Sequence, residues 1–187
     1  MSLRDRLGAM LRAIEARYWD WRLGIRTTRS TPAMPGGKAG DPTAYHVLFR
    51  AAAALRADDV LVDVGCGTGR ACAVFARFCR SVTGIEFSPE AAALARRNGL
   101  HVIATDARTA DYASATVLWI YNPFSPEVLR SVLRRARTPR VLYYNASDEH
   151  RDVFLAEGYA LVERLEFPGL RSAGEDYAVL GYRLREA

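Results

Sequence analysis

Short apolar runs alternate along this chain with segments whose apolar residues recur at helical spacing. The runs predict strands at 60–64, in a stretch ending at Glu86, and at 100–104, 116–121, 140–145, 159–167 and 177–185. The intervening segments predict helices at 43–55, 70–80, 88–98, 125–137 and 148–157. Strands that alternate with helices in this way are typical of an α/β fold with a doubly wound sheet.

The first of these strands leads into a glycine-rich turn with the sequence VLVDVGCGTG. Gly65, Gly67 and Gly69 permit backbone angles that other residues avoid, and they remove the Cβ atoms that would keep a ligand away. A helix is expected to start at Arg70, so its first amides point at the same place. The turn is therefore a candidate ligand site, although such a turn can also be only a tight connection.

The spacing of the glycines argues against a dinucleotide. The dinucleotide fingerprint G-x-G-x-x-G would place its third glycine at position 70, which is Arg70 in this chain. Two carboxylates accompany the turn: Asp63 lies within the strand, and Glu86 ends the next one. A carboxylate at a strand end can accept two hydrogen bonds from a vicinal diol, such as that of a ribose.

This arrangement of Asp63, three glycines and Glu86 resembles the cofactor site of class I S-adenosylmethionine-dependent methyltransferases. The Asn122-Pro123-Phe124 strand ending and the segments at 23–27 and 42–45 resemble those of small bacterial members of unassigned substrate. The resemblance implies a mostly parallel seven-stranded sheet that ends in a C-terminal antiparallel hairpin. It implies that Asp63 supports the turn and the ammonium group of the cofactor, that Glu86 binds the ribose, and that Asp106 binds the adenine amino group. The cofactor positions expected from it are Asp63, Gly65, Cys66, Gly67, Gly69, Glu86, Phe87, Asp106, Ala107, Asn122 and Tyr45.

Two of these positions have simpler interpretations. Asp106 follows a strand, where an aspartate often caps a turn. Tyr45 falls on the apolar side of the helix expected at 43–55, so it can serve only to pack that helix.

Asn122-Pro123-Phe124 follows the fourth strand, at the edge where an open α/β sheet places its chemistry. It is similar to the Asn-Pro-Pro-aromatic motif of class I enzymes that methylate planar amino nitrogens. There the asparagine and a proline carbonyl accept hydrogen bonds from the amine, and the aromatic ring stacks on the substrate. This chain has one proline and an earlier aromatic residue. The resemblance makes all three residues catalytic candidates, and the alternative is a rigid turn before a helix capped by Ser125.

Residues 1–40 are expected to form an N-terminal helical extension and a Pro/Gly-rich linker, and residues 41–187 the methyltransferase domain. All of the formal net charge of +5 lies in residues 1–40. One apolar stripe along the predicted helix consists of Leu3, Leu7, Leu11, Ile14, Tyr18, Trp21 and Ile25. We expect it to pack on the domain or on a partner, as in a homodimer. The alternatives are a clamp over an acidic substrate or nucleic acid, and a helix at a membrane interface.

The three cysteines show no C-x-x-C pair, which argues against a zinc site or a disulfide framework and favours a reduced, cytoplasmic protein. No apolar run is long enough to span a membrane. We therefore predict a methyltransferase that uses S-adenosylmethionine, binds no metal, and methylates a nitrogen or oxygen of an unidentified acceptor. The alternative function is a catalytically silent cofactor-binding subunit that acts through a partner protein.

Overall fold

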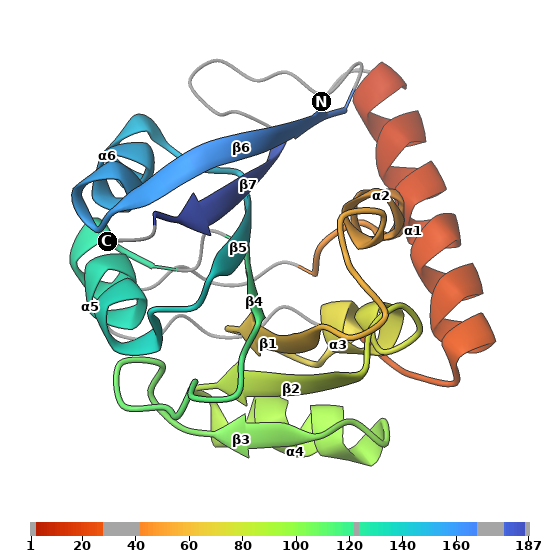
Figure 1. Ribbon diagram of the computed structural model, residues 1–187. Helices are drawn as coiled ribbons and strands as arrows, with labels where there is room; N and C mark the ends of the chain where they lie inside the picture. Colours follow the sequence, from red (N-terminus) through yellow and green to blue (C-terminus); the bar gives the residue numbers. More distant parts are fainter. Residues whose placement is uncertain (1–2, 28–41, 122–123, 168–177, 186–187) are drawn as a thin grey trace.

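A computed structural model describes residues 3–27, 42–121, 124–167 and 178–185. The strands in this part of the chain are β1 (Val60–Val64), β2 (Ser81–Glu86), β3 (Val102–Ala104), β4 (Val117–Tyr121), β5 (Arg140–Tyr144), β6 (Tyr159–Glu166) and β7 (Ala178–Leu184). They form one sheet in the order β3-β2-β1-β4-β5-β7-β6 (Figure 1). The strands from β3 to β5 run parallel, and β7 lies antiparallel between β5 and β6. The predicted sheet and its closing hairpin are confirmed.

The chain order reverses between β1 and β4, which lie side by side at the centre of the sheet. In open α/β sheets, ligands bind beyond the carboxyl ends of the strands at such a switch point. The topology therefore places the glycine turn after β1 at the centre of the expected site.

The helices are α1 (Leu3–Leu23), α2 (Tyr45–Ala52), α3 (Arg70–Phe75), α4 (Pro89–Arg97), α5 (Pro126–Ala136) and α6 (Asp148–Ala156). Each of the predicted helices is present, with ends that differ by a few residues. The start of α4 is the one expected, because the Ser88 hydroxyl accepts a hydrogen bond from the Ala91 amide and Pro89 occupies the first turn. None of the helices in the described ranges is both long and apolar enough to cross a bilayer.

The sheet is buried on both faces, as β4 illustrates. Leu118 and Ile120 face the core formed with α5 and α6, whereas Trp119 faces the core formed with α2 and α3. Figure 1 shows α5 and α6 on one side of the sheet, and α2 and α1 on the other. Such a strand reads as a continuous apolar run, which is why it is visible in the sequence.

The helix after the glycine turn is shorter than expected, because α3 ends at Phe75 and not near Arg80. After it, Arg77 and Phe78 donate to carbonyls only three residues back. The chain must turn back here to start β2, and the Arg80 amide donates to the Asp59 carbonyl (2.9 Å).

Of the described members of the predicted apolar stripe, Leu11, Ile14, Tyr18 and Trp21 are at least half exposed, so the expectation that they pack on the domain is wrong. Ile25, which follows α1, is buried, and packing of the stripe on a partner stays a prediction. The side of α1 that packs carries Ala16, Trp19 and Leu23 instead. The physical reason is that Trp19 meets the Phe49 ring of α2, with centroids 4.5 Å apart.

Candidate functional site

The glycine turn has the backbone conformation that its sequence predicts. Gly65, Gly67 and Gly69 all have positive φ angles, of 81°, 56° and 90°. A Cβ atom on Gly69 would lie 2.3 Å from the Leu100 side chain, so only glycine fits there. The amides of Gly65 and Cys66 donate to the Ile85 carbonyl (2.8 and 3.0 Å), which ties the turn to the end of β2. The turn is therefore an open cradle with a fixed position.

Glu86 lies directly beside this cradle, as expected for a residue that shares the ligand. Its two carboxylate oxygens accept hydrogen bonds from the Gly67 and Ser88 amides, both at 2.8 Å. The side chain is nearly buried. A carboxylate has about four lone-pair sites, so Glu86 retains the capacity to accept hydrogen bonds from a diol.

Asp63 is buried beneath the turn, with its Oδ2 accepting a hydrogen bond from the Cys72 thiol (3.2 Å). Burial raises the pKa of Asp63 to about 7, and the nearby charge of Glu86 contributes to the increase. A cation bound nearby would stabilise the carboxylate and lower this pKa. Cys66 is also buried, and a Cβ on Gly84 would lie 2.6 Å from its sulfur. The buried carboxyl group of Asp63 therefore fits an ammonium or sulfonium group as a neighbour.

The expected adenine end of the site lies after β2 and β3. Phe87 is 43% exposed although it is a large apolar residue. The Asp106 carboxylate binds the Arg108 guanidinium and also accepts a hydrogen bond from the Arg108 amide (2.8 Å). The second contact is that of a turn cap, so the simpler interpretation of Asp106 describes part of its role. Arg108 holds the pKa of Asp106 below its usual value. Ala107 is buried, and its carbonyl accepts a hydrogen bond from Tyr112 (2.7 Å).

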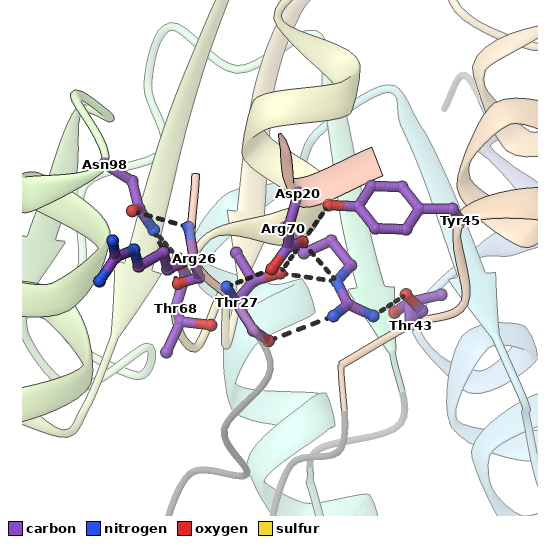
Figure 2. Close-up of polar contacts among 8 residues, drawn as sticks. All are labelled: Asp20, Arg26, Thr27, Thr43, Tyr45, Thr68, Arg70 and Asn98. Atoms are coloured by element: carbon purple, nitrogen blue, oxygen red, sulfur yellow. Dashed lines mark hydrogen bonds and ion pairs between the residues drawn. The ribbon is translucent and has the colours of Figure 1, made fainter. Parts of the chain in front are cut away.

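Arg70, the first residue of α3, lies at the centre of a buried polar network that the sequence did not reveal (Figure 2). Its Nε donates to the Thr27 hydroxyl (2.8 Å), and its Nη atoms donate to the carbonyls of Thr43 (3.2 Å) and Thr27 (3.3 Å). The Thr27 hydroxyl in turn donates to Asp20 (2.7 Å). The network joins α1 to the helix that follows the cofactor turn.

Tyr45 belongs to the same network. It is fully buried, its hydroxyl donates to Asp20 (2.5 Å), and the Arg70 guanidinium lies 4.8 Å from the centre of its ring. The interpretation of Tyr45 as a packing residue of α2 agrees with these contacts, and a direct cofactor contact stays a prediction.

A second link crosses from residue 26 to the other side of the turn (Figure 2). Asn98 follows α4. Its side-chain oxygen accepts a hydrogen bond from the Arg26 amide (3.0 Å), and its side-chain nitrogen donates to the carbonyls of Arg26 and Thr68 (both 3.2 Å). Residues 26–27 therefore lie across the end of the glycine turn.

Of the three catalytic candidates, Asn122 and Pro123 lie outside the described residues. Phe124 is 2% exposed and packs in the core with α5. Its carbonyl lies 3.0 Å from His150 Nε2, and His150 Nδ1 lies 2.7 Å from the Ser147 hydroxyl. The Phe124 ring is thus enclosed in this structure, and its stacking on a substrate stays a prediction.

Asn145 is a candidate that sequence reasoning missed. It directly follows β5, whose last residue, Tyr144, pairs with Tyr121 at the end of β4. Its φ is +62°, which is strained for a residue with a side chain. Its Oδ1 is buried and has no hydrogen-bond partner among the described residues. Asparagine tolerates the left-handed region better than most residues, but that tendency is a weak signal in a sequence.

Comparison with known proteins agrees with this geometry. Residues 61–142 match the family model of a methyltransferase domain. No curated protein matches the chain significantly.

Several solved structures share the fold. An RNA methyltransferase from Salinibacter ruber, in complex with S-adenosylhomocysteine, is 25% identical, with a TM-score of 0.59 over 78% of this chain and 95% of its own. The N-methyltransferase NodS from Bradyrhizobium japonicum, also with S-adenosylhomocysteine, is 19% identical, with a TM-score of 0.59 over 74% and 84%. A TehB-like methyltransferase from Corynebacterium glutamicum is 15% identical, with a TM-score of 0.60 over 78% and 90%.

The sheet order, the glycine cradle flanked by carboxylates, and the family match lead to the same answer. The described residues have the fold of class I methyltransferases and residues 61–142 match a methyltransferase domain, which supports S-adenosylmethionine as the cofactor.

Proposed function

We propose that this protein is an active enzyme that transfers a methyl group to a nitrogen or oxygen acceptor held beyond the carboxyl ends of β4 and β5. The observation that carries the proposal is Asn145, which lies at that edge with a left-handed backbone and a buried Oδ1 that has no hydrogen-bond partner among the described residues. An acceptor N–H or O–H would satisfy this oxygen, and strain of this kind concentrates at functional sites.

The cofactor would be held by the turn and its three carboxylates. Glu86 has lone pairs left for the ribose hydroxyls, and Asp63 offers its carboxylate to the ammonium group. Phe87 offers an exposed apolar ring for the adenine. Asp106 would reach the adenine amino group from the end of β3, in competition with Arg108.

The demands on the protein are modest, because S-adenosylmethionine supplies a methyl group that its sulfonium already activates. The residues at the edge must hold the acceptor in line and exclude water. Asn145 is suited to the first task, together with Asn122, which follows Tyr121 in the sequence. We therefore assign both asparagines to orienting the acceptor.

His150 is not suited to act as a general base, although it is buried near this edge. Its Nε2 must donate to the Phe124 carbonyl, so its Nδ1 accepts from Ser147. The imidazole therefore ties α6 to the segment after β4. This supports an acceptor that is nucleophilic without enzymic deprotonation, such as a neutral amine. The N-methyltransferase activity named for NodS is consistent with a nitrogen acceptor.

The three cysteines are free thiols, which supports a location in the reducing cytoplasm.

The experiment that tests this proposal has two stages. Calorimetry first measures the binding of S-adenosylhomocysteine to the wild type and to Asn145→Ala. The proteins are then incubated with S-adenosylmethionine labelled in its methyl group and with the small-molecule, RNA and protein fractions of a bacterial extract. We expect wild type to label one fraction and Asn145→Ala to bind S-adenosylhomocysteine normally but to label it at least about 100-fold more slowly.

The stability of the product narrows the acceptor group, because methyl esters release methanol in mild base whereas N-methyl groups and O-methyl ethers survive. Mass spectrometry of the hydrolysed product then distinguishes a methylated nitrogen from a methyl ether. A wild-type protein that binds S-adenosylhomocysteine but labels no fraction would favour the catalytically silent subunit. Full activity in Asn145→Ala would remove this residue from the site.

A further inference from the structure

The outward face of α1 exposes an unusual amount of apolar surface. Its large side chains are exposed by between 50% and 73%, at Met10, Leu11, Ile14, Tyr18 and Trp21. Leu11, Ile14, Tyr18 and Trp21 are spaced by three and four residues, and Met10 lies four residues before Ile14, so all five lie on one side of the helix. Contiguous apolar surface of this kind marks an interaction site. We refer to these five residues as the outer stripe.

The outer stripe cannot turn inward, because the opposite side of α1 is anchored. Trp19 packs on Phe49, and Asp20 is buried in the Arg70 network. Figure 1 shows α1 at the margin of the molecule, on the far side of α2 from the sheet. The helix therefore presents the stripe to the surroundings as a fixed surface.

The charge around the outer stripe is basic on both margins. At roughly 100° per residue, Arg17 borders one edge of the stripe and Arg22 the other, and both are exposed. The acids of α1 whose side chains are described point elsewhere: Glu15 binds the His46 amide (3.0 Å), and Asp20 is buried. The outer face thus combines apolar side chains with exposed arginines, while the described carboxylates of α1, Glu15 and Asp20, bind the His46 amide and Arg70.

A shallow depression of about 420 Å³ adjoins the end of the stripe. Its lining includes Arg17, Trp21 and Arg26, with an indole that is 73% exposed, and also Asp20, whose carboxylate is paired with Arg70. Arginine binds phosphate oxygens in bidentate fashion, and tryptophan favours the headgroup level of a bilayer. The depression fits the phosphate of a lipid headgroup.

We propose that α1 docks the protein on the surface of a membrane that contains anionic phospholipids. The outer stripe enters the boundary between headgroups and acyl chains, while Arg17, Arg22 and Arg26 bind lipid phosphates. A helix with arginines on its polar margins and Trp and Leu on its apolar face binds membranes in this orientation.

Two other occupants fit the face less well. A second copy of the chain would bring arginines against arginines across the pairing helices, which repels. A nucleic acid would engage the arginines and the two aromatic rings, but it offers no apolar surface to Met10, Leu11 and Ile14. A bilayer offers acyl chains to the apolar side chains of the outer stripe and phosphates to the arginines on its margins.

The test is sedimentation of the protein with two kinds of vesicle. One contains phosphatidylcholine alone, and in the other about 30% of the lipid is the anionic phosphatidylglycerol. We expect binding only to the anionic vesicles, weakened by salt, with a blue shift of the tryptophan fluorescence that Trp21→Phe removes. Arg17→Gln with Arg22→Gln should lower the partition coefficient roughly 30-fold, since each basic residue contributes about fivefold. Ile14→Glu should lower it at least about tenfold.

The matched control is Leu155→Glu, which places the same charge at an equally exposed helical position on α6. Because both positions are exposed, neither substitution should alter urea unfolding. Equal vesicle binding by Ile14→Glu and wild type would overturn the proposal. So would a wild-type dimer in light scattering that Ile14→Glu dissociates, or binding of an RNA oligonucleotide without binding of anionic vesicles. None of these measurements requires methyl transfer, so they do not depend on the proposed function.

Discussion

The Arg70 network gives the sharpest prediction about stability. Arg70→Met keeps the volume and the apolar stem of the side chain but removes its charge and all its donors. The variant leaves Asp20 buried without its cation, and it leaves the carbonyls of Thr27 and Thr43 without their partner. Removing one member of a buried ionic network costs about 3–5 kcal/mol of unfolding free energy.

For a domain of this length, that loss lowers the melting temperature by roughly 6–20 °C, at about 2–4 °C per kcal/mol. Urea unfolding followed by tryptophan fluorescence measures the free energy directly. Asp20→Asn should also destabilise. The double variant should lose less than the sum of the two, because neither charge then remains buried alone.

The control is Arg134→Met, which removes an exposed arginine that pairs with Glu157 (3.0 Å). It should hardly move the unfolding midpoint, because the Arg134 guanidinium is solvated and Arg130 still pairs with Glu157 (3.5 Å). If Arg70→Met unfolded at the same urea concentration as Arg134→Met, the Arg70 network would not contribute to the free energy of unfolding, and the prediction would be refuted. We also expect Arg70→Met to weaken S-adenosylhomocysteine binding in calorimetry, because Arg70 begins the helix that follows the cofactor turn.

Three further predictions concern the site. The folded pKa of Asp63, about 7, lies above its ordinary value of 3.8, so its contribution to stability is present below pH 4 and is lost as the pH rises through 7. In urea unfolding, Asp63→Asn should abolish that dependence and stabilise the cofactor-free protein at pH 8 by on the order of 4 kcal/mol, while calorimetry shows weaker S-adenosylhomocysteine binding. Asn145→Gly should relieve the positive φ, so that thermal unfolding shows equal or greater stability while methyl transfer is lost; retained transfer would contradict the role of Asn145. Glu86→Gln should weaken S-adenosylhomocysteine binding roughly tenfold in the same assay without unfolding the turn, and an unchanged affinity would count against ribose binding.

Most of the fold and the conformation of the glycine turn could be predicted from the sequence because their signals are local. A strand buried on both faces is a continuous apolar run, as β4 is, and the positive φ angles after β1 fall on glycines. Glu86 was found because it ends the adjacent strand. Such features depend on residues a few positions apart, so one stretch of sequence is enough to read them.

The orientation of α1 could not be predicted in the same way. Tyr18 and Trp21 form one apolar line along the helix, and Trp19 and Leu23 form another. The periodicity cannot decide which line packs, because the decision is made by Phe49, about 30 residues further on, in a different helix. The outward position of the first line is therefore a property of the tertiary structure.

Arg70 was informative in the sequence only as the wrong residue for a dinucleotide site. In that fingerprint the third glycine allows the helix to approach the sheet closely. In this chain the glycine that allows a close approach is Gly69, which packs against Leu100 and lies one position before the third glycine of that fingerprint. The side chain at position 70 is consequently free to be large, and it reaches Thr27 and Thr43, which are 43 and 27 positions away in the sequence.

The one-residue shift in glycine spacing thus has two effects. It changes the ligand that the turn accepts, and it allows the same turn to hold residues 20–27 in place through Arg70. The face of α1 that binds Arg70 and the face that carries the outer stripe belong to one helix. A membrane bound at the outer stripe would therefore be connected to the cofactor turn through Asp20, Thr27 and Arg70, without any contact of its own with the site.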